Sequence, residues 1–475
     1  MKPTILAMAV LAAVGVGLGT AYQTAARQRH YRVLLARGDA ALADGDTFAA
    51  IEAYSGAIAF RSDSMVAHLR LGETYLHSNN LEEAAREFRL ASRLDPAAVR
   101  PLEELGDVTY QQQNYARAVD AYQHFLRLDD TSARVSYKLA LAWYREGEFE
   151  RSLQSLRDTI RLDPRMGDAY YLLAVCLRER RGERNDSTAE ARVALEHALA
   201  LMPGSIPVRE ELADVYASAG RVDDELEQLQ VLASLDRDHI ERQIAIGLAH
   251  ARAARTSSAP VRARHEDLAV LTLSGALERS PDDPLVYRAL GQVWLDIALG
   301  RQDRVALNKA REALARVVST PSAATSDALT LYGRALMRAG EVDLAERTLR
   351  QATERFPVEP SAFMQYATVA ELSNRYEAAR RALIQYGLLV VNDADFVSRA
   401  SRIASLSLRL NDAPDAVHWL QQASSAAPED LHLVALLADA QLRAGDRAAA
   451  RATVAAGLKK DSGNVVLLQL QNRAR

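Results

Sequence analysis

Small and aromatic side chains return at a regular spacing along most of this chain. The clearest copy of the pattern, residues 64–96, carries Leu71, Gly72, Tyr75, Ala84, Phe88, Ala91 and Pro96 in that order. A partial copy precedes it, and further copies follow at intervals of about 34 residues. A pattern that recurs in this way indicates one structural unit used many times. We therefore expect a linear array of units and not a single enlarging core.

Each copy predicts two antiparallel amphipathic helices, A and B. Apolar residues three and four apart form one stripe on each helix. Gly72 on helix A and Ala84 on helix B are small, which lets the two helices approach where they cross. Pro96 falls after helix B, where a missing N–H costs little. One pair cannot bury its own apolar stripe, so successive pairs must stack.

This pattern resembles the tetratricopeptide repeat, a helix–turn–helix unit. The resemblance implies an all-α fold, a right-handed α-solenoid of stacked helix–turn–helix repeats, and a function in binding proteins or peptides. Roughly eleven or twelve units can be traced, enough for a stable array. We expect residues 465–470 to form a capping helix over the last pair.

The repeats predict four regions. Residues 30–255 form a first repeat block, with the best copies at 30–164, and residues 284–475 form a second block. Residues 256–283 are an irregular repeat or insert, because the stretch from Thr256 to Pro260 interrupts the pattern. Residues 1–26 precede the repeats. Within the first block, a polar insert from Arg180 to Ser187 delays helix B of the fifth unit.

Residues 1–26 predict an N-terminal hydrophobic helix, either a cleaved signal peptide or a transmembrane anchor. The first charged residue after Lys2 is Arg27. The apolar stretch of roughly 18 to 20 residues is borderline for a membrane span. Basic residues are nearly all arginine, which is typical of a GC-rich bacterial genome. We therefore expect a bacterial cell-envelope protein, either anchored in the inner membrane or exported to the periplasm. A cytoplasmic protein is the alternative.

Several classes of function find no support in the sequence. The net charge of −4 argues against a nucleic-acid-binding protein. Cys176 is the single cysteine, so neither an intramolecular disulfide nor a cysteine-based metal site can form. His265 and Glu266 lack the second histidine of a zinc-protease helix, and no phosphate-binding loop is present. We expect no catalytic residues, no metal and no cofactor.

A local arginine cluster, Arg252, Arg255, Arg262 and Arg264, lies in the irregular middle of the chain. We interpret it as a solvated loop and the start of a helix and not as an anion site.

The resemblance places the helix A side chains opposite the core along a concave groove. The candidate groove residues here are Glu73, His77, Glu103, Asp107, Tyr137, Lys138, Tyr144, Tyr171 and Arg178. Three of them, Tyr137, Tyr144 and Tyr171, are expected to form a row of rings, since aromatic residues are enriched at binding surfaces. Carboxylates dominate the early positions, which favours a basic or neutral extended peptide.

Two specialised grooves of the family are absent by sequence. One clamps a peptide carboxylate with Lys and Asn on successive A helices, but the comparable positions of the early units carry none of these. The other is an asparagine ladder, and asparagine is sparse in this chain.

The sequence thus favours a non-enzymatic scaffold for protein or peptide partners. Tethering to the membrane or export through residues 1–26 would suit a role in assembly, secretion or polysaccharide export. Two alternatives stay open: a cytosolic adaptor or regulator, and a non-catalytic subunit of an enzyme complex.

Overall fold

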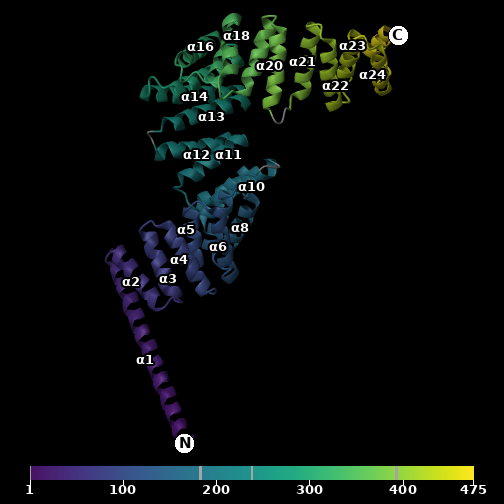
Figure 1. Ribbon diagram of the computed structural model, residues 1–475. Coiled ribbons are helices and arrows are strands. Elements are labelled where there is room, and N and C mark those ends of the chain that lie inside the picture. Colours follow the sequence, from purple (N-terminus) through teal and green to yellow (C-terminus); the bar gives the residue numbers. More distant parts are fainter. Residues whose placement is uncertain (1, 181–183, 237–238, 391–393) are drawn as a thin grey trace. The chain divides into compact units, whose positions relative to one another are not determined.

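The computed structural model describes residues 2–180, 184–236, 239–390 and 394–475, without the side chains of residues 2–20 and 184–186. Over these ranges the regular structure consists of 25 helices and no strand (Figure 1). The predicted all-α class is confirmed. The chain divides into two compact units, residues 1–228 and 229–475. The four regions predicted from the sequence stay a prediction.

Twelve helices begin in the first unit. Their bounds are α1 Lys2–Ala43, α2 Thr47–Phe60, α3 Met65–His77, α4 Leu81–Leu94, α5 Arg100–Gln111, α6 Tyr115–Leu128, α7 Ala133–Arg145, α8 Phe149–Leu162, α9 Gly167–Glu179, α10 Arg184–Leu201, α11 Ile206–Ser218 and α12 Val222–Leu235. Odd-numbered helices are the A helices and even-numbered helices are the B helices. The polar insert predicted from Arg180 to Ser187 falls partly on residues 181–183, outside the described ranges, and its last four residues already belong to α10.

The second unit continues the alternation. Its helices are α13 Ile240–Thr256, α14 Ala259–Arg279, α15 Pro284–Arg301, α16 Arg304–Ser319, α17 Ser326–Ala339, α18 Val342–Glu354, α19 Pro360–Leu372, α20 Tyr376–Leu389, α21 Phe396–Arg409, α22 Ala413–Ala426, α23 Leu431–Arg443, α24 Arg447–Lys460 and α25 Val465–Ala474. Twelve pairs with a final single helix agree with the expected number of units. The predicted capping helix is α25.

Short polar motifs begin and end these helices. Ser64 accepts a hydrogen bond from the N–H of Ala67 at 3.2 Å, and Asp446 accepts one from Ala449 at 2.9 Å. Such caps satisfy backbone donors that have no partner inside the helix. Between helices A and B, one residue often adopts positive φ, as Gly147 (77°) and Asn374 (56°) do. This left-handed residue reverses the chain within a few residues.

The predicted helix crossing at Gly72 is confirmed. A Cβ atom at Gly72 would lie 2.7 Å from the ring of Phe88, closer than real contacts allow. Ala84 and Phe88 are fully buried on the B helix beneath it. The glycine is therefore required for the ring to lie flat against helix A.

Residues 256–283, predicted as an irregular repeat or insert, contain the end of α13, all of α14 and the turn that follows it. Thr256 is the last residue of α13 and Ala259 the first of α14, so Ser257 and Ser258 form the turn between them, and Pro260 lies in the first turn of α14. Proline is tolerated there because its N–H would have no partner inside the helix. The two helices pack together through Gly247, whose Cβ position lies 2.6 Å from Leu273. This segment is a helix pair with longer helices.

Helix α1 is a single helix of 42 residues, and its C-terminal part pairs with α2 (Figure 1). The contact is again a glycine against a ring, because the Cβ position of Gly38 lies 2.5 Å from Tyr54. None of the helices in the described part of the chain is both long enough and apolar enough to cross a membrane.

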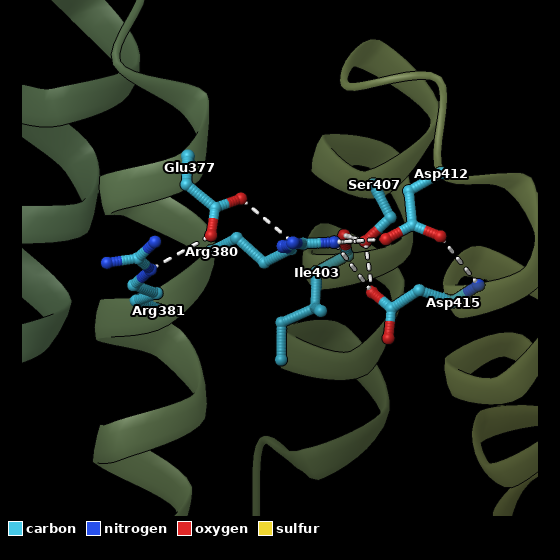
Figure 2. A network of polar contacts seen from close by, with 7 residues as sticks. All are labelled: Glu377, Arg380, Arg381, Ile403, Ser407, Asp412 and Asp415. Carbon is cyan, nitrogen blue, oxygen red and sulfur yellow. Dashed lines mark hydrogen bonds and ion pairs between the residues drawn. The ribbon is translucent and has the colours of Figure 1, made fainter.

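Polar networks join consecutive pairs. In the second unit, Arg380 on α20 reaches the start of α22, where it donates to the capping residue Asp412 at 2.8 Å and to Asp415 in the first turn at 3.2 Å (Figure 2). The same guanidinium also donates a hydrogen bond to Glu377, one turn earlier on α20, at 2.8 Å. This network lowers the pKa of Asp412, chiefly through the hydrogen bond from Arg380. The network therefore joins α20 of one pair to the next pair.

Candidate peptide-binding face

The predicted groove residues lie on four successive A helices of the first unit, α3, α5, α7 and α9. Three of them, Glu103, Asp107 and Lys138, contact one another across neighbouring repeats, and Glu73 and Arg178 pair with other residues of the next repeat. We call this surface the A-helix face. It has a charged part on α3 and α5 and an aromatic part on α7 and α9.

Glu73 is buried and already paired. Its carboxylate lies 3.1 Å from Arg70 on the same helix and 2.6 Å from Arg100 on α5. The side chain of Glu73 is only 11% exposed, so its charge faces these two guanidinium groups more than solvent. His77, one turn later, lies 2.8 Å from the backbone carbonyl of Glu73 through Nδ1. It remains exposed at the end of α3.

Lys138 on α7 bridges two carboxylates on α5. Its Nζ atom donates to Glu103 at 2.7 Å and to Asp107 at 2.6 Å. Arg134 pairs with Glu103 as well. Asp107 also accepts a hydrogen bond from the hydroxyl of Tyr122 on α6, at 2.7 Å. A single carboxylate therefore connects the helix crossing below it to the next repeat.

The expectation of an acidic early groove is not met. Each acidic candidate, Glu73, Glu103 and Asp107, has a basic partner. The partners lie on the next A helix, about one repeat along the chain, where inspection of a single repeat does not find them. This part of the face is close to electrically neutral and carries no strong preference for a basic peptide.

The aromatic part consists of half-buried tyrosines. Tyr137 and Tyr144 lie two turns apart on α7, and Tyr171 lies on α9. All three pack against the largest core cluster of the first unit while keeping part of their surface accessible. Tyr144 also contacts the ring of Phe149, with centroids 5.9 Å apart. The three predicted rings thus pack against one core cluster, and their use as a binding surface stays a prediction.

Burial makes two of these phenols, Tyr137 and Tyr171, weaker acids. Desolvation raises the pKa of Tyr137 to about 12, with Asp168, Tyr110 and Tyr171 adding to the shift. Burial also raises the pKa of Tyr171, and the neighbouring Tyr144 contributes. The raised pKa values keep the phenols of Tyr137 and Tyr171 neutral at physiological pH.

Tyr110 on α5 is a fourth ring of this group that the sequence analysis missed. It occupies the position of Tyr144 one repeat earlier, and its hydroxyl accepts a hydrogen bond from Arg145 at 3.2 Å. It also contacts Tyr115 edge-on, with centroids 5.2 Å apart. The one-repeat offset from Tyr144 is the signal that could have found it. We call Tyr110, Tyr137, Tyr144 and Tyr171 the tyrosine row.

Arg178 ends the candidate surface on α9. It pairs with Glu211 on α11 and lies 3.9 Å from Asp214. It occupies the position of Tyr144 one repeat later. At this position the α9 repeat therefore has an arginine that forms ion pairs with α11, and not a tyrosine.

Cys176 is fully buried, and burial raises the pKa of its thiol to about 11. In the part of the chain that the structure covers, no three histidine, cysteine or acidic side chains gather where they could hold a metal ion.

Comparison with known proteins identifies the repeats. The family model described as tetratricopeptide repeat matches residues 35–99, 69–133, 103–164, 137–206 and 330–388. No curated protein matches the chain.

Solved structures resemble the chain at low identity. They include the crystal structure of MamA, with 23% identity over 35% of this chain and 94% of that chain and a TM-score of 0.33. YrrB, described as a TPR protein with an unusual peptide-binding site, is 20% identical over 40% of this chain and 96% of its own, with a TM-score of 0.35. Yeast Tom70 is 15% identical over 94% and 95% of the two chains, with a TM-score of 0.38. The family assignment rests on the matched repeats. They show, together with the paired helices and their glycine crossings, that this chain belongs to the tetratricopeptide repeat family.

Proposed function

We propose that the chain is a non-enzymatic scaffold that holds an extended segment of a partner protein on the tyrosine row. The observation that carries the proposal is the position of these rings. They are half-buried and pack against core clusters, so the core already restricts each side chain while part of each residue stays accessible. A ring held in this way loses little rotamer freedom when a partner covers it.

The paired charges decide which partner suits this face. A charged peptide would have to displace partners such as Lys138 from Glu103 and Asp107, at contacts of 2.6–2.7 Å. An uncharged peptide with aliphatic or aromatic side chains instead gains apolar contact with the tyrosine row and leaves the ion pairs in place. Desolvated aromatic anchors of this kind contribute about 2 kcal/mol or more each.

The scaffold is proposed to be non-enzymatic because its reactive groups are engaged in packing or pairing. The carboxylates of the face neutralise neighbouring cations, and the thiol of Cys176 lies inside the core. Such groups stabilise the repeats and are not poised to transfer protons to a substrate.

A display library of random peptides tests the binding face, because it offers many side-chain combinations at once. We expect the full chain to select peptides rich in aliphatic and aromatic residues. The triple variant Tyr137→Ala, Tyr144→Ala, Tyr171→Ala should lose most of this enrichment. The matching Tyr→Phe triple variant should keep it, because the rings remain.

The control places two substitutions on a B helix, Arg86→Ala with Arg93→Ala on α4. Helicity and melting are measured for every variant, since the tyrosines also pack against the core. If a folded Tyr→Ala triple variant selects the same peptides as this control, the tyrosine row is not the binding site.

We also propose that residues 1–26 tether the scaffold to a bacterial inner membrane or direct its export. The proposal rests on the uncharged stretch between Lys2 and Arg27. Deleting residues 1–26 should move the protein to the soluble fraction or stop its export, as measured by cell fractionation and by a reporter that is active only outside the cytoplasm. A full-length protein found free in the cytoplasm would favour the cytosolic adaptor. Co-purification with a catalytic partner would favour the subunit of an enzyme complex.

A further inference from the structure

The second unit contains a cavity between three helices that are longer than those of the first repeats. Helices α13, α14 and α15 have 17, 21 and 18 residues, whereas α2 to α9 have 12 to 14. The cavity, of about 210 Å³, is lined by residues from all three. Ala254 and Arg255 come from the last turn of α13, Arg262 from the first turn of α14 and Gly300 from the last turn of α15. The additional turns therefore build its walls.

Small and apolar residues give the cavity its room. Ala251, Val293 and Ile297 are buried and line it. Gly300 leaves open space, because a Cβ atom there would meet nothing within 4 Å. A cavity of about 150 Å³ lined by apolar side chains is enough to bind benzene. The present cavity can therefore hold a branched aliphatic side chain or an aromatic ring.

An ion pair also lines this cavity. Arg255 on α13 donates to Asp296 on α15 at 2.8 Å, and their side chains are 51% and 24% exposed. Arg255 donates through one nitrogen only, so further N–H groups of the guanidinium remain for a ligand. The second oxygen of Asp296 can likewise accept another hydrogen bond. The pair thus presents a donor group and an acceptor group side by side.

Two further charged residues line the cavity, one positive and one negative. Arg262 is positioned by the carbonyl oxygens of Ala254 and Ser257, at 3.2 and 3.3 Å. Glu266, which is buried, pairs with Arg301. The four charged residues that line the cavity are two arginines and two acids, so neither a bare anion nor a bare cation is favoured.

We propose that this cavity binds a free α-amino acid with an apolar side chain. In the amino acid, a carboxylate and an ammonium group are neighbours. In the cavity, the guanidinium of Arg255 and the carboxylate of Asp296 are neighbours, so each charge of the ligand can face an opposite charge. The carboxylate faces the guanidinium of Arg255 and the ammonium faces the carboxylate of Asp296. The side chain lies against Val293 and Ile297, in the space beside Gly300. This site is separate in residues from the tyrosine row, and the proposal does not depend on peptide binding.

Isothermal titration calorimetry on the full chain tests the proposal with L-leucine, L-isoleucine and L-phenylalanine. We expect at least one of them to bind with one molecule per chain. Its amide, which lacks the carboxylate, and its N-acetyl derivative, which lacks the ammonium, should each bind at least tenfold more weakly. Equal binding of either derivative would overturn the proposal, as would the absence of binding by all three amino acids at millimolar concentration.

Variants locate the site. Gly300→Leu fills the cavity and should weaken binding at least tenfold, while Gly275→Leu on α14 is the matched control, since its Cβ also meets nothing within 4 Å and it lies outside the lining. Both replace a helical glycine by a better helix former, so folding is preserved. Asp296→Asn should also weaken binding at least tenfold. Unchanged affinity of Gly300→Leu and Asp296→Asn would show that the amino acid binds elsewhere and would overturn the proposal.

Discussion

The two units solve the same packing problem with different side chains. In the first unit, glycines on the A helices meet rings on the B helices: Gly38 meets Tyr54, Gly72 meets Phe88 and Gly106 meets Tyr122. In the second unit, glycines meet leucines: Gly247 meets Leu273, Gly291 meets Leu314 and Gly333 meets Leu349. The Cβ positions lie 2.3–2.7 Å from the nearest partner atom in all six.

The difference shows what a ring adds at a crossing. The hydroxyls of Tyr54 and Tyr122 reach Asp39 and Asp107 on the A helix, each at 2.7 Å. Asp107 continues to Lys138 of the next repeat. A leucine fills the same space but cannot extend such a chain of contacts. At these crossings the first unit therefore connects its core to its A-helix face, whereas the three leucines of the second unit make only apolar contact with their glycines.

Overpacking the crossings should have the largest effect. Gly72→Trp should lower the free energy of unfolding by about 3 kcal/mol, since a tight crossing cannot admit the added volume. Gly333→Trp should cost less, because Leu349 can change rotamer more easily than the flat ring of Phe88 can move. Urea denaturation followed by circular dichroism measures both.

Gly204→Trp is the control, because a Cβ atom at this exposed glycine meets nothing within 4 Å. Unfolding of Gly72→Trp like that of the wild type would mean that the repeat register is wrong. A greater loss at Gly333 than at Gly72 would contradict the comparison of the two units.

Alkaline pH should destabilise the first unit before the second. Burial is the largest cause that raises the pKa of tyrosines 54, 75, 122, 137, 171 and 216 in the first unit, and of Tyr366 alone among the described tyrosines of the second. An unfolded tyrosine loses its proton near about pH 10. A tyrosine whose pKa is raised in the folded state keeps its proton at this pH. This contribution to stability is therefore complete below pH 10 and is lost as the pH rises through the folded pKa, about 12 for Tyr137.

The three tryptophans separate the two responses. Trp143 lies in the first unit, and Trp294 and Trp419 lie in the second. The double variant Trp294→Phe, Trp419→Phe reports on the first unit, and Trp143→Phe reports on the second. As the pH is raised, we expect the fluorescence of the double variant, which reports on the first unit, to change at a lower pH than that of Trp143→Phe. Coincident transitions would show that the tyrosines do not set the difference.

Removing one hydroxyl should have the smallest effect. Tyr122→Phe loses the hydrogen bond to Asp107 and should cost about 1 kcal/mol. The ring itself is accommodated, as Phe88 shows at the same position one repeat earlier. Asp107 keeps Lys138 as a partner. Thermal denaturation of the variant measures the cost, and a loss as large as that of Gly72→Trp would mean that the network and not the packing holds the crossing.

Much of this fold is readable in the sequence, since each repeat carries its own small and large residues. Gly72, Ala84 and Phe88 predict their crossing because these contacts lie within one pair. The charge pairs Arg100–Glu73 and Lys138–Asp107 join different repeats, and no local spacing indicates them. The grouping of Tyr137, Tyr144 and Tyr171 was predictable from the repeat period.

The lengths of α13 to α15 were harder to predict. Ala and Gly fill both the regular and the extended turns there, so composition does not reveal where a helix ends. The arginine cluster interpreted as a solvated loop supplies Arg255 and Arg262 to the cavity. Their role depends on Asp296, some forty residues away, and on the packing of three helices.

The burial of Cys176 makes the rate of thiol modification a measure of local unfolding. The thiol lies in the core beside Ser152, 3.3 Å away, and its raised pKa keeps it protonated. Because the thiolate is the reactive form, an alkylating reagent modifies this residue only when its repeat opens. The rate of modification therefore counts local openings of one repeat within the array. For the same reason, the folded chain presents no reactive thiol to an oxidising or a reducing environment.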